Sequence, residues 1–118
     1  MRARIALLAA VAALVAVGSA GAMSTPKLIG TVGSGFTISL KTPAGKAVKA
    51  LKAGKYTFVV TDKASIHDFV VEGPGVSKEI TGVAFVGTKT VTLNLRKGKY
   101  KIYCRPHESS LFQFVAVT

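Results

Sequence analysis

The sequence predicts an all-β domain folded as a β-sandwich of about seven or eight strands. Short runs of β-branched and aromatic residues recur along the chain, and Gly, Pro and Lys turn residues separate them. No helical periodicity of any length appears after the first 22 residues. The turns recur at the spacing typical of a two-sheet sandwich.

The predicted strands share a β-rich composition and flanking turn signals. In chain order they are 27–32, 36–40, 55–61, 66–72, 82–85, 89–95, 99–104 and 113–117. Alternation is cleanest in 89–95, where Val91, Leu93 and Leu95 point to one face.

Two of the turns repeat a short pattern. The segments "LKAGKY" (51–56) and "LRKGKY" (95–100) share L-x-x-G-K-Y, and each feeds a predicted strand. We interpret them as two equivalent corners of the sandwich and not as the trace of a duplicated domain.

The first 22 residues have the pattern of a secretory signal peptide. Arg2 and Arg4 form a basic start, residues 5–17 are apolar, and small residues follow. We expect cleavage after Ala22, with Ala20 as the second choice. The apolar run is short for a membrane span, although an uncleaved anchor remains the alternative.

The remainder, 23–118, is the length of one domain. It contains a single cysteine, so no internal disulfide can form and a packed core must stabilise the fold. The leader predicts an exported protein, either periplasmic or extracellular at the cell envelope.

The chain is strongly basic, with 16 basic and 5 acidic residues and a net charge of +11. Removing Arg2 and Arg4 from that count leaves +9. This excess favours an acidic protein partner or an anionic envelope surface. Nucleic acid is not an expected partner, because the sequence has no stacking motif and no basic helix. Lysine-rich strand edges favour a monomer.

Three residues form a candidate metal site. Cys104 ends a predicted strand, His107 follows it by three residues, and His67 stands near the start of an earlier strand. A sandwich can bring these two strands side by side, so that two imidazoles and one thiolate converge. His₂Cys is the donor set of blue-copper electron-transfer centres.

Other chemistries fit these residues less well. Structural zinc needs four Cys or His ligands, and attached c-type haem needs C-x-x-C-H. A thioredoxin-like role needs a second cysteine. A Cys–His nucleophile needs a cleft and an orienting group, for which a small sandwich has little room. We therefore expect no enzyme activity and no small-molecule substrate.

At this point the sequence resembles the cupredoxins, in the plastocyanin/azurin-like group of small exported bacterial copper proteins. The segments that carry the resemblance are "LKAGKYTFVV", "IHDFVVEGPGV" and "GTKTVTLNLRKGKYKIYCRPH", and the likeness covers about 32–117. The resemblance implies a Greek-key cupredoxin-like sandwich. It also implies that His67, Cys104 and His107 bind one type 1 copper ion, through which the protein carries single electrons between redox partners.

The sequence departs from that family at the position of the weak axial methionine. Leu111 and Phe112 stand there instead, and the only methionines are Met1 and Met23. We expect Leu111 to cap the site without an axial sulfur. An oxygen from Glu108 or Gln113 is the alternative.

A second departure lies beside the expected ligands. Asp68 follows His67, where similar proteins have Asn, and Arg105 follows Cys104, where a small or acidic residue is usual. These two side chains either form a partly buried ion pair that fixes the ligand loop or remain independent surface charges.

Two other functions remain open at this stage. The same three residues would also serve an exported protein that stores or delivers copper. Alternatively, the domain has lost copper and acts as an interaction module. For an electron carrier, the resemblance implies that His107 lies near the surface in an apolar patch with Pro106, Leu111 and Phe112.

Overall fold

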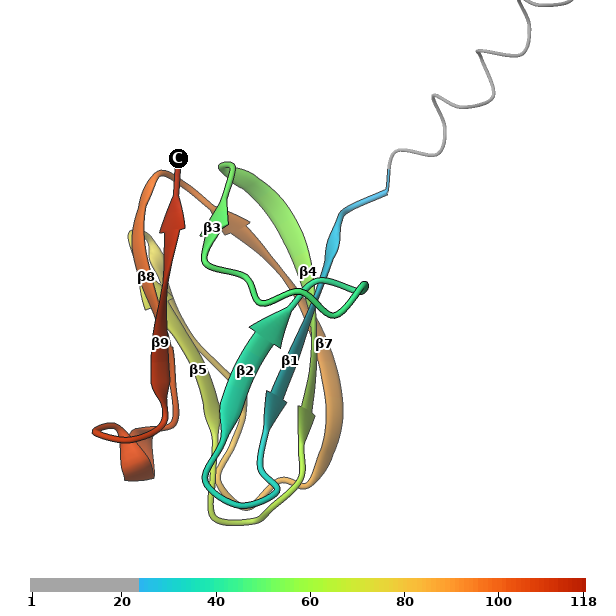
Figure 1. The fold of residues 1–118 in the computed structure, drawn as a ribbon, viewed down its shortest axis with the longest axis vertical. Helices are drawn as coiled ribbons and strands as arrows, with labels where there is room; N and C mark the ends of the chain where they lie inside the picture. The colour runs from blue at the N-terminus through green and yellow to red at the C-terminus, as the bar shows by residue number, and fades with distance from the viewer. Residues whose placement is uncertain (1–23) are drawn as a thin grey trace, which may run out of the picture.

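The computed structural model describes residues 24–118, which form two packed β-sheets (Figure 1). The predicted signal peptide, 1–22, and its cleavage site lie outside the described residues. Among residues 24–118, no helix is long and apolar enough to cross a membrane.

The first sheet has the strand order β2-β1-β4-β7. Its strands are β1 (Lys27–Val32), β2 (Ile38–Lys41), β4 (Gly54–Asp62) and β7 (Gly87–Leu95). β1 pairs parallel with β4, and the other pairs are antiparallel. Inward-facing positions alternate along β4, so that Phe58 and Val60 are buried as the period of a strand requires.

The second sheet has the order β3-β9-β8-β5-β6. Its strands are β3 (Ala50–Leu51), β5 (Phe69–Gly73), β6 (Val76–Thr81), β8 (Gly98–Tyr103) and β9 (Phe112–Val117). The two sheets enclose one hydrophobic cluster whose buried members run from Leu28 to Val117. Residues from both sheets of the described chain thus share one core.

The predicted all-β sandwich is confirmed, with corrections to individual strands. The segment 82–85 is not a strand but a turn, in which the Phe85 N–H donates to the Gly82 carbonyl at 3.1 Å. β6 was missed because its sequence "VSKEIT" exposes three polar residues in succession. The strand predicted from residue 66 begins only at Phe69, so that His67 and Asp68 lie in the loop before it.

The repeated L-x-x-G-K-Y pattern forms two equivalent corners, as predicted. In each corner the glycine has a positive φ, 154° at Gly54 and 146° at Gly98, which favours glycine over other residues. The Tyr56 hydroxyl donates to the Lys52 carbonyl at 2.7 Å, and the Tyr100 hydroxyl donates to the Arg96 carbonyl at 2.9 Å. One tyrosine thus braces each corner in the same way.

The Tyr100 corner is the more buried of the two. Tyr100 is 1% exposed, and its hydroxyl also accepts the Arg96 N–H at 2.9 Å and contacts the Pro74 carbonyl at 3.0 Å. Tyr100→Phe removes these bonds and leaves the Arg96 N–H without its partner. We expect the free energy of unfolding to fall by about 1–3 kcal/mol, measured by denaturant titration.

Tyr56→Phe is the matched control, because its single hydroxyl bond is exposed to water. We expect a smaller loss from this substitution. Equal losses from the two variants would contradict the assignment of Tyr100 as the principal brace.

Candidate metal centre

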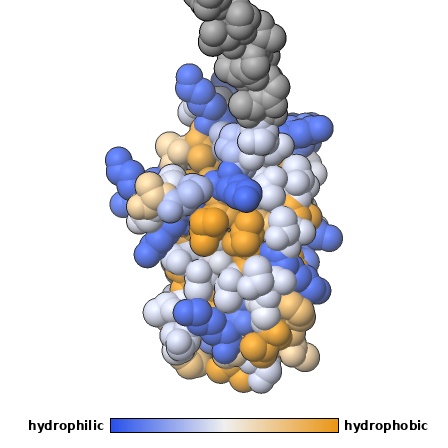
Figure 2. All heavy atoms as spheres, turned by 90° about the vertical axis from the view of Figure 1, so that its right-hand side faces the viewer, coloured by the Kyte–Doolittle hydropathy of each residue, from blue (hydrophilic) through white to orange (hydrophobic). Residues whose placement is uncertain are grey.

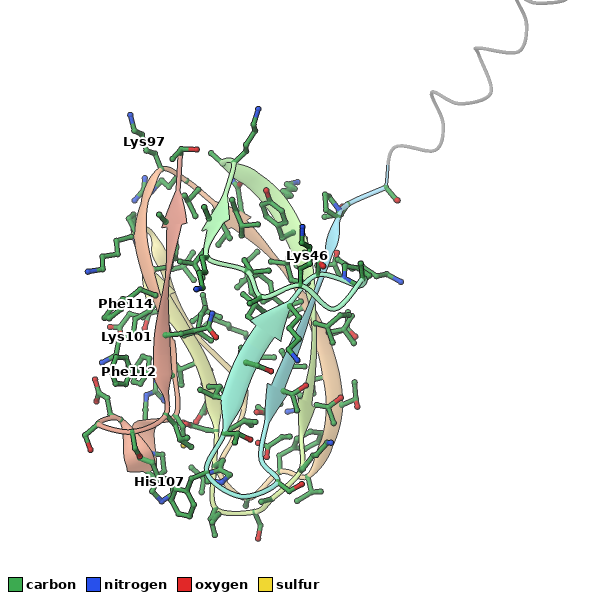
Figure 3. All side chains as sticks on the ribbon, viewed as in Figure 1. Lys46, Lys97, Lys101, His107, Phe112 and Phe114 are labelled. Atoms are coloured by element: carbon green, nitrogen blue, oxygen red, sulfur yellow. The ribbon has the colours of Figure 1, made fainter. Side chains whose placement is uncertain are left out.

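The three predicted site residues meet at one end of the sandwich. His67 lies in the loop between β4 and β5, and Cys104 directly follows β8. His107 closes the short 3₁₀ helix η1 (Arg105–His107), and Figure 3 shows it at the lower end of the molecule. Residues 37 and 40 positions apart along the chain are brought together in this way.

The donor atoms of these residues form a small triangle. The Cys104 Sγ lies 3.7 Å from the His67 Nδ1 and 3.6 Å from the His107 Nδ1, and the two Nδ1 atoms are 3.2 Å apart. Within residues 24–118, this is the one group of three or more His, Cys, Asp or Glu residues that could hold a metal ion.

The size of the triangle fits a transition-metal ion. A point equidistant from three atoms at these separations lies about 2.0 Å from each, close to ordinary metal–nitrogen and metal–sulfur bond lengths. One soft sulfur and two imidazole nitrogens match the donor preference of copper. The residues present therefore fit a trigonal copper ion.

A backbone contact fixes the ring of His67. The His67 Nε2 lies 2.9 Å from the Gly35 carbonyl oxygen. A carbonyl oxygen only accepts, so Nε2 must carry the proton, and the lone pair of the neutral ring is on Nδ1, inside the triangle. Sequence reasoning missed Gly35, because a main-chain acceptor leaves no residue-type signal.

Cys104 is fully buried in the hydrophobic cluster. Burial raises the pKa of its thiol above the usual value, while N–H groups nearby act in the opposite direction. The Asp68 N–H points at the Cys104 Sγ from 3.5 Å, and the Cys104 N–H donates to the Leu111 carbonyl at 3.0 Å. The first contact restrains the sulfur and the second restrains the main chain of Cys104.

Asp68 and Arg105 are in contact, mainly through the backbone of Arg105. The Arg105 N–H donates to the Asp68 Oδ1 at 2.7 Å. The Arg105 guanidinium is more distant, at 4.0 Å from the Asp68 Oδ2 and 3.5 Å from the Glu79 Oε2. The buried Asp68 carboxylate thus ties the His67 loop to the Cys104–His107 loop.

His107 is half-buried and has an apolar surround. The exposed Phe36 ring meets the His107 ring edge-on, with centroids 4.5 Å apart, and also contacts His67 at 5.3 Å. Ile66 and Val86 are exposed on neighbouring loops of the same end. Figure 2 shows apolar side chains at the lower end of the molecule.

The residues around His107 differ from those that the sequence predicts. Leu111 is only 1% exposed and belongs to the core, so it does not contribute to the surface. Phe112 is exposed, but it lies beside Phe114 and Lys101 on β9 and β8, along the side of the molecule (Figure 3). Phe36 takes the place beside His107 that the sequence analysis gave to these residues.

The two candidate oxygen donors are engaged elsewhere. The Glu108 carboxylate pairs with the Lys101 ammonium at 2.6 Å and is not part of the donor group. The Gln113 amide donates to the Val48 carbonyl at 3.2 Å. Leu111 is buried in the same cluster as Cys104, whereas Met1 and Met23 lie outside the described residues.

No protein-family profile matches the sequence, and no curated protein sequence matches it. Solved structures do match the fold. The copper protein rusticyanin superposes with a TM-score of 0.58 at 15% identity, covering 78% of this chain and 76% of rusticyanin. Reduced rusticyanin gives a TM-score of 0.58 at 17% identity, with 78% of each chain covered.

An oxidized methionine-to-leucine variant of amicyanin matches with a TM-score of 0.51 at 17% identity, covering 77% of this chain and 81% of amicyanin. Rusticyanin and amicyanin are cupredoxins. At such identities a likeness establishes the fold alone. The chain therefore has the cupredoxin fold, with a His-Cys-His cluster like that of a blue copper site.

The contact between Asp68 and Arg105 leads to a prediction for the copper-free protein. Asp68→Ala removes the acceptor of the Arg105 N–H, so we expect the free energy of unfolding to fall by about 1–3 kcal/mol. Asp68→Asn keeps an oxygen acceptor and should cost less. Denaturant titration of both variants measures the difference.

A double-mutant cycle with Arg105→Ser separates the backbone bond from the ion pair. Because the guanidinium lies 4.0 Å away and is half exposed, we expect little coupling between Asp68→Asn and Arg105→Ser. Strong coupling would show that the side-chain ion pair, and not the N–H bond, holds the two loops together.

Proposed function

We propose that the protein is a type 1 (blue) copper protein that carries single electrons outside the cytoplasm. The triangle of His67 Nδ1, Cys104 Sγ and His107 Nδ1 carries this proposal, because its size and its donor types both suit copper. When bound, copper supplies a one-electron couple between Cu(II) and Cu(I).

The chain contributes a rigid arrangement of donors. The Gly35 carbonyl orients His67, and the Asp68 N–H and the core orient Cys104. Ligands held in this way cannot rearrange toward the geometry that one oxidation state prefers. A small structural change between oxidation states is what fast electron transfer requires.

The proposed path for electrons leaves through His107. It is the donor residue that reaches the surface, and Phe36, Ile66 and Val86 provide apolar contact area at the same end. Excess positive charge elsewhere on the domain would attract an acidic redox partner or an anionic envelope surface. We expect a monomeric carrier and not an enzyme, because all the chemistry assigned to the site requires only the three protein donors.

Storage or delivery of copper is the second candidate function. The half-buried His107 favours it, since this edge of the triangle is accessible to a copper acceptor. A carrier retains its copper through repeated reduction and oxidation, whereas a delivery protein loses Cu(I) to a chelator or an acceptor.

The first test is the visible absorption spectrum of the copper-loaded domain 23–118. We expect an intense thiolate-to-copper band in the visible region, one copper per chain, and reversible cyclic voltammetry. Cys104→Ser should abolish the band while the fold is retained, as judged by the β-sheet circular dichroism. A colourless protein without stoichiometric copper would exclude both the carrier and the delivery function and leave the interaction module.

The Leu111 position leads to a second prediction. A fourth donor, where none was present, stabilises Cu(II) more than Cu(I), so we expect Leu111→Met to lower the reduction potential of the loaded protein. Leu and Met differ little in volume, so the fold should tolerate the change. Leu51→Met, far from the site, is the control for a general effect of methionine. An unchanged potential in Leu111→Met would show that Leu111 does not face the metal.

A further inference from the structure

Five exposed cations gather at the end of the sandwich opposite the metal centre. We call this group the basic pole; its members are Lys52, Lys55, Arg96, Lys97 and Lys99. Register places them together, because Gly54 pairs with Leu95 and Lys55 with Asn94, so that the turn before β4 lies beside the turn after β7. Figure 3 shows Lys97 and His107 at opposite ends of the molecule.

No acidic side chain neutralises the basic pole. Within residues 24–118, each ion pair of the structure involves Lys101 or Arg105, and neither belongs to the pole. Of the five acidic residues, Glu72 lies nearest, opposite Lys101 on β8, and its carboxylate accepts the Tyr103 hydroxyl at 2.6 Å. In the described part of the chain, none of the five forms an ion pair with a pole residue: they are Asp62, Asp68, Glu72, Glu79 and Glu108. A terminal carboxylate at Thr118, whose main-chain oxygen accepts the Ala53 N–H, would offset one of the five charges.

The pole is built on the two tyrosine-braced corners. The same bonds that fix the Lys52 and Arg96 turns also fix the backbone from which all five side chains project. Rigid turns present the cationic side chains from one end of the domain, so little backbone entropy is lost when they meet a charged surface. The L-x-x-G-K-Y repeat in the sequence is therefore also a repeat of the cations.

The pole is too far away to serve the metal centre. β4 runs its full nine residues between the two ends, which spans about 30 Å at the usual rise of a strand. The screening length at physiological ionic strength is about 8 Å. The five charges thus have almost no electrostatic effect on the donor triangle and require a different explanation.

The chemistry of the pole favours a lipid surface over a protein partner. Protein interfaces have aromatic or aliphatic groups at their centre and charges at the rim. One exposed large apolar side chain of residues 24–118 contacts the pole: the Lys99 ammonium lies 4.2 Å from the centroid of the Phe114 ring. The others are at other places: Phe36, Ile66, Val83, Val86 and Phe112. Five cations with a single aromatic ring among their contacts suit a layer of phosphate headgroups better than an apolar protein interface.

The start of the domain lies at the same end. β1 pairs parallel with β4, with Lys27 opposite Thr57, and the Pro26 carbonyl accepts the Thr57 N–H at 2.8 Å. Whatever precedes Pro26 therefore joins the domain near the basic pole. Contact of this end with a membrane is compatible with both a cleaved and an uncleaved leader.

We propose that the basic pole docks the domain on an anionic phospholipid bilayer and directs the His107 end away from the membrane. This deepens the anionic-surface part of the proposed function, but it depends on the five charges and not on copper. Electron exchange at the far end would then remain open to a partner while the carrier stays on the membrane surface.

The test measures the binding of the copper-free domain 23–118 to vesicles by co-sedimentation. One set of vesicles contains phosphatidylglycerol and phosphatidylcholine in equal parts, and the other contains phosphatidylcholine alone. We expect binding to the anionic vesicles only, weakening steeply with salt. A metal-free domain keeps a failure of this proposal distinct from a failure of the copper assignment.

A pole variant and a matched control distinguish the effect of where the positive charges lie from the effect of the total charge. The pole variant is Lys52→Gln/Lys55→Gln/Lys97→Gln, and the control is Lys63→Gln/Lys78→Gln/Lys89→Gln; each removes three positive charges from exposed positions. At about fivefold per lysine near the membrane, the pole variant should lose on the order of 100-fold in partitioning. The control should lose only a few-fold. Equal losses would overturn the proposal.

Two further measurements address orientation and the rival partner. Acetylation of lysines, quantified by mass spectrometry with and without anionic vesicles, should show protection at Lys52, Lys55 and Lys97 while Lys63 and Lys89 stay reactive. Uniform protection would overturn the proposed orientation. If the pole variant binds vesicles as the parent does but loses affinity for polyglutamate, the pole recognises an acidic polypeptide and the lipid proposal is wrong.

Discussion

The antiparallel pairing of β5 with β8 is the constraint on which the site depends. Val70 lies opposite Tyr103 and Val71 opposite Ile102, so the residues just before β5 and just after β8 emerge together. That places His67 and Asp68 beside Cys104. A slip of one residue would move His67 and Asp68 away from Cys104, so the register that Val71 helps to fix through the hydrophobic cluster also places the three donor residues together.

The same pairing explains why Asp68 contacts both the Cys104 sulfur and the main chain of Arg105. Its N–H points at the Cys104 Sγ, and its carboxylate accepts the N–H of Arg105, so one residue reaches both sides of the loop that leaves β8. An asparagine side chain could make the second bond without a charge. The carboxylate additionally attracts Arg105, whose guanidinium also lies 3.5 Å from Glu79. The guanidinium compensates this charge only in part, because it is half exposed and shared with Glu79, and the Asp68 Oδ2 has no hydrogen-bond partner among residues 24–118.

Sequence patterns predicted the sandwich, the two corners and all three residues of the triangle, because these depend on residue type and on alternation. They failed where the outcome depends on contacts between distant segments. Nothing local marks Gly35 as the partner of His67 or Phe36 as the cover of His107, since both act through a loop whose path β1 and β2 decide. β6 was hidden for a similar reason: its outward face is polar and it is held by pairing with β5.

The chain restrains the three donor side chains to different degrees, and the least restrained of them is the one nearest the surface. His67 is fixed at Nε2 by a carbonyl, and Cys104 is fixed by the core and by two N–H contacts. His107 sits on a single 3₁₀ turn, and its surface contact is the Phe36 ring, itself 58% exposed. The main chain of His107 is held by the Cys104 carbonyl and the Leu111 N–H, so only its ring, on the side that faces solvent, is less restrained than the side chains of His67 and Cys104. Phe36 contacts the rings of both histidines at this exposed side, so it covers part of the triangle without contributing a donor to it.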